Sequence, residues 1–498
     1  MKRKAGILLN VSSFPGKYGI GGFSSDAEKV LDEFAMMGIK LWQTLPVTAL
    51  GAGNSPYSGV SSFAGNYLYI DPERLDGLLT ADEAASFRYN GDVYLTDYAF
   101  ASAKKREALE LAYSRIGLKE KEGMELFIKD NAYWLPDYAA YMTLKEKNGG
   151  AMWSDWADEE KFYSEKLCKK VKKEMSERYN FYVFEQYVFF SQWKKIHDYA
   201  ASYGIEVFGD LPIYVNYDSS DVWAHTDLFL LDKELRRKKV AGVPPDYFAK
   251  DGQLWGNPLY DYEKMALTGY KWWVERLCHA LKLYDVVRID HFRGLYEYWA
   301  VDAEENTAKN GKWEKGPDLA IFKELKKKIK NPKIVAEDLG IIDDNIRDFL
   351  KRSGFYGMRV FQFGFDGDAN NKHLPHEYIP ECVAYTGTHD NDTTLGWLLS
   401  LDENTRRQVF DYVDCDDGYG WASGAGRCRA TKAVIRSVLS SCADIAIIPM
   451  QDLCGYGSDT RMNVPGKAED CWRYRTNFGA INGIDHDFLR KIIRIYGR

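Results

Sequence analysis

The sequence predicts an α/β fold, a (β/α)8 TIM barrel with large insertions between its second and third strands. Three observations support this prediction. Eight short apolar runs that stop at polar residues recur along the 498 residues, and amphipathic stretches separate several of them. This alternation builds a parallel sheet. The link between the second and third runs is too long for one helix, and eight strand-helix units close into a barrel more readily than they form an open sheet.

The eight predicted strands share apolar or β-branched residues followed by a polar stop. They are residues 6–11, 40–47, 206–215, 285–292, 333–339, 357–364, 382–390 and 444–453. The order of these runs along the chain is therefore expected to be the order of the strands around the barrel.

Helices are predicted between several of these strands. Residues 24–38 have Ser24 as a candidate N-cap, with an acid close behind. Residues 261–284 place apolar side chains on one stripe, and residues 344–354 end at a glycine. No clear helix is expected over residues 365–381, between the sixth and seventh strands.

The expected domain organisation follows from these elements. Residues 1–48 supply the first two strands, and residues 202–498 supply the other six. Residues 49–80 are rich in Gly, Ser and Tyr, and they predict an inserted subdomain of loops and short strands. Residues 81–201 are charged and predict a second, mostly helical inserted subdomain.

Composition excludes several classes of function. The net charge is −7, and no basic stripe interleaves with aromatic residues, so nucleic acid is not an expected partner. No apolar run reaches the ~20 residues that span a bilayer, and the basic start lacks a cleavage site, so no membrane segment or signal peptide is expected. The eight cysteines form no Cys-x-x-Cys pair. They predict a reducing, cytoplasmic location.

Acidic residues follow the apolar part of five predicted strands. These acids are Asp210, Asp290, Glu337, Asp390 and Asp452. The C-terminal ends of barrel strands form the catalytic face, so the five acids are expected to converge there. Any one of them could be an isolated cap or ion-pair partner, but five buried carboxylates are costly without a purpose. Arg288, His291 and His389 lie beside them, and Arg288 is expected to hold Asp290 ionised.

Clustered carboxylates without a metal-ligand pattern are typical of glycoside cleavage. Metal-assisted hydrolysis is the main alternative, but Pro375 between His373 and His376 prevents the helix that a zinc motif of this kind needs. Residues 366–377 match several positions of a calcium loop but lack its glycine, which leaves a structural calcium open. The dinucleotide-loop pattern is incomplete and the zinc motif fails at Pro375, so no cofactor and no catalytic metal are expected. No serine lies in a GxSxG pattern and no thiol has a neighbouring histidine, so Ser or Cys nucleophile chemistry is not expected.

Eight motifs, in order along nearly the whole chain, resemble those of the 4-α-glucanotransferase family, which includes amylomaltases and disproportionating enzymes. They are SPYSG at Ser55, GDLPIYV at Gly209, GVPPDYF at Gly242, LWGNPLY at Leu254, RIDHFRG at Arg288, AEDLG at Ala336, TGTHDNDTTLGW at Thr386 and PMQDL at Pro449.

This resemblance implies three catalytic residues: Asp290 as nucleophile, Glu337 as general acid/base and Asp390 as transition-state stabiliser. It also implies six substrate-binding residues, which are Tyr57, Asp210, Trp255, Arg288, His291 and His389. Two segments depart from the family pattern. Ala249, Lys250 and Asp251 stand where Ser and Thr are more usual, and EDCWRYR from Glu469 replaces GNWxWR. Contacts from these segments are therefore left open.

The resemblance further implies a retaining double displacement on α-1,4-glucans, with carboxyl groups about 5 to 5.5 Å apart. Residues 241–257, with two prolines and with Tyr247, Phe248 and Trp255, are expected to form a lid loop that keeps water from the intermediate. Two alternatives stay open: an α-1,4-glucan hydrolase of amylase type, and a non-catalytic glucan-binding barrel. The oligomeric state is also open.

Overall fold

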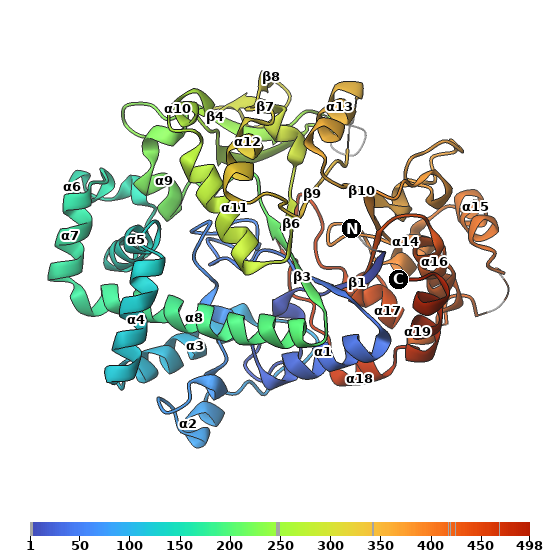
Figure 1. The fold of residues 1–498 in the computed structure, drawn as a ribbon, viewed down its shortest axis with the longest axis horizontal. Coiled ribbons are helices and arrows are strands. Elements are labelled where there is room, and N and C mark those ends of the chain that lie inside the picture. Colours follow the sequence, from blue (N-terminus) through green and yellow to red (C-terminus); the bar gives the residue numbers. More distant parts are fainter. Residues whose placement is uncertain are drawn as a thin grey trace.

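The structure, a computed structural model, describes residues 3–245, 250–340, 343–416, 418, 420–423, 425–467 and 469–498. Its centre is a sheet of eight parallel strands (Figure 1). They are β1 (Lys4–Leu8), β2 (Leu41–Gln43), β3 (Glu206–Leu211), β6 (Val286–Ile289), β9 (Ile334–Ala336), β10 (Gly357–Val360), β11 (Cys382–Tyr385) and β12 (Ile445–Pro449).

The strands follow chain order around a closed barrel. β12 pairs with β1, and a single bridge between Val335 and Tyr356 joins β9 to β10. Each of the eight predicted runs overlaps one of these strands. The prediction of a (β/α)8 barrel is confirmed.

Helices cover the outside of the barrel. Those that follow β1, β3, β6 and the later strands are α1 (Ser25–Met37), α9 (Ser220–Ala224), α10 (Tyr262–Leu267), α11 (Lys271–Leu283), α12 (Ala320–Lys328), α13 (Asp344–Ser353), α14 (Thr394–Ser400), α15 (Glu403–Val413), α16 (Arg429–Ser440), α17 (Met450–Cys454), α18 (Phe478–Asn482) and α19 (His486–Ile495). As predicted, Ser24 caps α1: its hydroxyl accepts a hydrogen bond from the Ala27 amide at 3.3 Å. Among the described residues, every helix is too short or too polar to span a lipid bilayer.

Two helix predictions have different outcomes. The single helix expected over residues 261–284 is wrong, because α10 and α11 are separate helices. Gly269 and Tyr270 between them have φ values of 62° and 55°, in the left-handed region that ends helices. Over residues 365–381 the described chain forms only one short 3-10 turn, Pro375–Glu377, which confirms that no regular helix lies there.

The chain between β2 and β3 holds the large insertion. Residues 49–80 form loops, two short 3-10 turns and isolated bridges such as the one between Thr48 and Gly65. Seven helices follow: α2 (Ala81–Ser86), α3 (Tyr98–Tyr113), α4 (Leu118–Asp130), α5 (Leu135–Lys147), α6 (Asp158–Lys161), α7 (Glu165–Glu174) and α8 (Ser176–Ser202). Figure 1 shows these helices on one side of the barrel and α14 to α19 on the opposite side. The division into two subdomains stays a prediction.

A second, antiparallel sheet was not predicted. Its strands, in the order β5-β4-β7-β8, are β5 (Gln253–Pro258), β4 (Lys239–Val243), β7 (Glu297–Asp302) and β8 (Lys312–Lys315). Much of the predicted lid loop, residues 241–257, is therefore a hairpin of β4 and β5. Residues 246–249, with Tyr247, Phe248 and Ala249, lie outside the described part of the chain.

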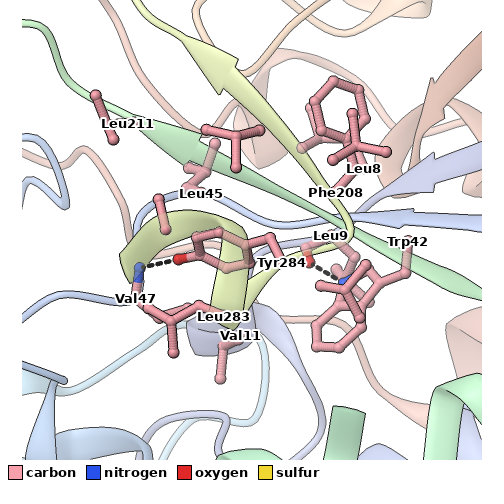
Figure 2. Close-up of a cluster of buried hydrophobic side chains, with 14 of the residues drawn as sticks. Leu8, Leu9, Val11, Trp42, Leu45, Val47, Phe208, Leu211, Leu283 and Tyr284 are labelled. Carbon is pink, nitrogen blue, oxygen red and sulfur yellow. Dashed lines mark hydrogen bonds between the residues drawn. The ribbon is translucent and has the colours of Figure 1, made fainter. Parts of the chain in front are cut away.

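A buried apolar cluster packs the first three barrel strands against the end of α11 (Figure 2). The Trp42 indole donates a hydrogen bond to the Leu9 carbonyl at 2.8 Å, and the Val47 amide donates to the Tyr284 hydroxyl at 3.3 Å. A Cβ atom at Gly209 would lie 2.2 Å from the Tyr284 ring. Glycine at this position therefore allows the ring to pack against β3 immediately before Asp210.

Candidate active site

Arg288, on β6, is the centre of a charged cluster at the C-terminal end of the barrel. Its Nη1 donates to Asp210 Oδ2 at 2.6 Å, and its Nη2 donates to Asp290 Oδ1 at 2.7 Å. The Asp210 side chain is fully buried and that of Arg288 is 5% exposed, whereas that of Asp290 is 30% exposed. Asp210 and Arg288 are register partners on β3 and β6, which places them side by side. The cluster thus holds one buried cation between two carboxylates, one of which reaches solvent.

Glu337 follows β9 and lies against the same strand end. Its Oε2 accepts a hydrogen bond from the His291 amide at 2.8 Å, and its Oε1 accepts one from the Leu339 amide at 2.7 Å. His291 directly follows Asp290, so the amide links the two acids. Its φ of 50° is unusual for a non-glycine residue, and such conformations cluster at functional sites.

The Glu337 carboxyl is poised to exchange a proton near neutral pH. Burial raises its pKa to about 7; the negative charge of Asp290 raises it too, while Arg288 and the two amides lower it. A carboxyl group of this kind holds its proton near neutral pH and can donate it.

Tyr57 and His389 connect Asp390 to this cluster. The Tyr57 hydroxyl donates to Asp210 Oδ2 at 2.7 Å, and its ring stacks on that of His389 with the centroids 5.2 Å apart. His389 Nε2 lies 3.4 Å from Asp390 Oδ2. The structure therefore brings together residues from the insertion, from β3 and from the end of β11.

Trp255 reaches the site from β5. Its side chain is 38% exposed, and its ring centroid lies 4.9 Å from that of His291, nearly perpendicular to it. Burial lowers the pKa of His291 to about 4, so this imidazole is neutral at pH 7. The exposed indole and the neutral imidazole form an uncharged wall beside Asp290.

Two buried polar atoms of this cluster have no hydrogen-bond partner among the described residues: Asp210 Oδ1 and His291 Nε2. Native proteins leave few buried polar groups unpaired, so unpaired atoms at a pocket indicate a polar ligand. One cavity is lined by Tyr57 and Asp210, and another is lined by His389. The arrangement suits a ligand that carries several hydroxyl groups.

Asp452 does not join the cluster, so the prediction that all five acids converge is wrong for this residue. Asp452 lies in α17, where its Oδ2 accepts from the hydroxyls of Thr386 and Thr394 at 2.5 and 2.7 Å. Its Oδ1 accepts from the Thr394 amide at 2.7 Å. These hydrogen bonds satisfy the carboxylate and tie α17 to the start of α14, which is a structural role.

Sequence reasoning missed three residues of the C-terminal segment that support the site. Asn463 Nδ2 donates to Asp390 Oδ1 at 2.6 Å, and the Arg461 guanidinium donates to the Asp390 carbonyl at 2.6 Å. The Trp472 ring lies 5.9 Å from the rings of both Tyr57 and His389. The only sequence signal was EDCWRYR, which contains Trp472; Arg461 and Asn463 gave none.

The histidines weighed as metal ligands have other partners. His373 Nδ1 accepts from the Val360 amide at 3.1 Å, and the His376 ring nitrogens pair with the Tyr412 hydroxyl and the Ala369 carbonyl. Across the described residues, no group of three or more His, Cys, Asp or Glu side chains is placed to hold a metal ion.

Comparison with known proteins identifies the family of this chain. The family model described as 4-alpha-glucanotransferase, glycoside hydrolase family 77, matches residues 9–480. The chain belongs to this family. It is 41% identical to the 4-alpha-glucanotransferase of Clostridium butyricum, over 98% of this chain and 100% of that protein. It is 42% identical to that of Aquifex aeolicus, over 100% of this chain and 99% of that protein.

A solved structure of the 4-alpha-glucanotransferase family shows the same fold. The amylomaltase from Streptococcus agalactiae, determined in complex with acarbose, superposes with a TM-score of 0.94 at 33% identity. The alignment covers 100% of both chains. The resemblance noted in the sequence is thereby confirmed at the level of family and fold.

Proposed function

We propose that this protein cleaves an α-1,4 linkage in a donor glucan and transfers the glycosyl segment to the 4-hydroxyl of an acceptor glucan or glucose. The observation that supports this most directly is the pairing of Asp290, bonded to Arg288, with the buried Glu337, beside the unpaired polar atoms Asp210 Oδ1 and His291 Nε2. Two carboxyl groups with different environments provide a nucleophile and a general acid. Family membership supports transfer as the outcome.

In the first step, Asp290 attacks the anomeric carbon while Glu337 gives its proton to the departing glycosidic oxygen. This forms a covalent glycosyl-enzyme and releases the leaving glucan. In the second step, Glu337 takes the proton of the acceptor 4-hydroxyl, which attacks the same carbon and frees Asp290. Two inversions give retention, and Asp390 stabilises the positive charge that develops on the sugar. This mechanism needs the two carboxyl groups about 5 to 5.5 Å apart.

The other site residues bind the sugar in this proposal. Asp210 Oδ1 accepts a hydrogen bond from a sugar hydroxyl, and neutral His291 bonds another through Nε2. Arg288 and His389 orient the acids Asp290 and Asp390. Tyr57 and Trp255 present rings on which sugar faces pack.

Maltotriose tests the reaction type, and we expect it to yield a ladder of longer and shorter maltooligosaccharides. The physical reason is that the intermediate on Asp290 meets an acceptor sugar before water, so glycosyl groups are redistributed. Chromatography of the products over time is the measurement. Glucose and maltose alone would indicate the amylase-like hydrolase, and unchanged maltotriose would indicate the non-catalytic glucan-binding barrel.

The pH dependence tests the role of Glu337. Transfer measured as kcat/KM should fall as the pH rises above about 7, because only protonated Glu337 can donate and its pKa is raised to about 7. Glu337→Gln should lose nearly all turnover and with it this basic limb. A Glu337→Gln variant with full turnover would exclude Glu337 as the acid.

We also propose that the protein acts in the cytoplasm, with α-1,4-glucans as its partners. Maltooligosaccharides and chains of starch or glycogen fit a site built for α-1,4-glucans. All eight cysteines are free thiols, the state that a reducing cytoplasm maintains.

A further inference from the structure

The pairing between β9 and β10, beside Glu337, is the shortest in the barrel wall, and we call it the β9–β10 seam. Neighbouring barrel strands elsewhere pair over three to five register positions. β9 and β10 share only the bridge between Val335 and Tyr356, with the Ala336 amide donating to the Tyr356 carbonyl at 2.8 Å. Glu337 directly follows this single contact. β6 holds the end of β9 from the other side, through the hydrogen bond from the Glu337 amide to the Ile289 carbonyl at 3.1 Å, so it is the β10 side that needs a further interaction.

Asp338 provides that interaction. Its Oδ1 accepts a hydrogen bond from the Met358 amide at 2.6 Å, and its Oδ2 accepts one from Arg359 Nη1 at 3.0 Å. Its side chain is only 7% exposed. A Cβ atom at Gly357 would lie 2.7 Å from Oδ2, so glycine lets the carboxylate approach β10 this closely. The carboxylate thus replaces the ladder hydrogen bonds that the seam lacks.

The anchor acts on the chain that carries Glu337. The two neighbouring carboxyl groups bind opposite sides: that of Asp338 bonds the Met358 amide of β10, while that of Glu337 bonds the His291 amide at the end of β6. The Leu339 amide, which binds Glu337 Oε1, directly follows Asp338. Ala336 and Asp338 are therefore tied to β10 on both sides of Glu337.

We propose that Asp338 is a positioning residue that holds the Glu337 carboxyl in its buried, proton-donating place by closing the seam between β9 and β10. This inference rests on the proposed function. The groups that face Glu337 itself are Arg288, Asp290 and the His291 amide on the β6 side, and the Leu339 amide on its own segment. Asp338 acts through the backbone, because its charge is taken up by Arg359.

Asp338→Ala should lower the kcat for transfer from maltotriose by tenfold or more, since a displacement of about 1 Å at a catalytic group costs on the order of 10²-fold. KM should change little, because the sugar-binding residues lie on other strands. Water that reaches Glu337 should lower its pKa toward its ordinary value, so the basic limb of the pH profile should move to lower pH. Asp338→Asn retains an oxygen for the Met358 amide and should recover part of the kcat.

Asp285 offers a matched control at the other end of the barrel. It precedes β6, its Oδ2 accepts from the Val207 amide of β3 at 2.8 Å, and it lies 3.2 Å from His197 Nε2. Asp285→Ala removes the same kind of carboxylate-to-strand bond far from Glu337. It should lower thermal stability while keeping the kcat and the basic limb of the wild type.

Assays of the wild type and of the Asp338 variants distinguish a failure of the proposed function from a failure of this inference. Wild-type protein that forms no maltooligosaccharide ladder would overturn the proposed function, and this inference with it. An active wild type with an Asp338→Ala variant of unchanged kcat and pH profile would overturn the inference alone. If Asp338→Ala does not fold, Asp338→Asn decides: a lowered kcat with a shifted basic limb supports positioning, and wild-type kinetics refutes it.

Discussion

Replacing Asp290 by asparagine should abolish transfer from maltotriose, with a fall in kcat on the order of 10⁴-fold or more. The amide cannot form the covalent glycosyl intermediate, whereas its oxygen can still accept the hydrogen bond from Arg288 Nη2. Thermal stability should be unchanged or higher, because the change removes one of several crowded acids and catalytic sites are often locally destabilised. Product chromatography and the thermal midpoint measure the two effects.

Asp452→Asn is the matched control, because Asp452 is another strand-end acid but lies outside the Arg288 cluster. Its carboxylate is bonded to Thr386 and Thr394, so the variant should lose stability and keep most of its kcat. An Asp290→Asn protein that fails to fold would contradict the prediction. It would show that Asp290 has a structural role and would end its assignment as nucleophile.

The barrel could be predicted because its strands are buried on both faces. Each appears in the sequence as a short apolar run with a polar stop, such as the run that ends at Arg288 and Asp290. Two strands of the second sheet carry no such signal: β5 is mostly half-buried, β8 is mostly exposed, and both contain polar residues, so nothing marks them as strands. The break between α10 and α11 was missed because a single glycine such as Gly269 is tolerated inside a helix as well as at its end, so it does not mark a boundary by itself.

The site was predictable only where its residues belong to strand ends. Asp290, Glu337 and Asp390 follow barrel strands and Asp210 lies at the end of β3; the topology of the barrel brings such positions together. Asp452 has the same sequence pattern, but its carboxylate is hydrogen-bonded by Thr386 and Thr394. Only folding brings these two threonines next to it. Asn463, Arg461 and Trp472 lie in a loop, whose position in space is not encoded by periodicity.

Replacing Arg288 by methionine should destabilise the fold by about 3 to 5 kcal/mol and abolish transfer. The side chain is similar in length, but the change leaves buried Asp210 and the nearby Asp290 without their cation. Breaking a buried ion pair by removing one partner costs this much because the remaining charge is uncompensated. The urea midpoint of unfolding measures the loss. Arg352→Met is the control: Arg352 pairs with Asp318 on the surface, so its loss should be much smaller.

The pH dependence of this loss identifies its cause. Without Arg288, the pKa of Asp210 should rise further than burial already raises it. Below the unfolded value of about 3.9, Asp210 is protonated in both states and the variant should differ least from the wild type. As the pH rises from there toward the folded pKa of the variant, the unfolded state releases its proton first, so the deficit should grow and then level off above that pKa.

Adding Asp210→Asn to Arg288→Met should then restore part of the lost stability, since the buried charge is gone and the two changes share one interaction. Activity should not return, because Asp290 still lacks the guanidinium that orients it. A double variant as unstable as the sum of the two single variants would contradict this account. It would mean that Arg288 stabilises the barrel by packing and not by balancing the two carboxylates, and the electrostatic basis assigned to the site would fail with it.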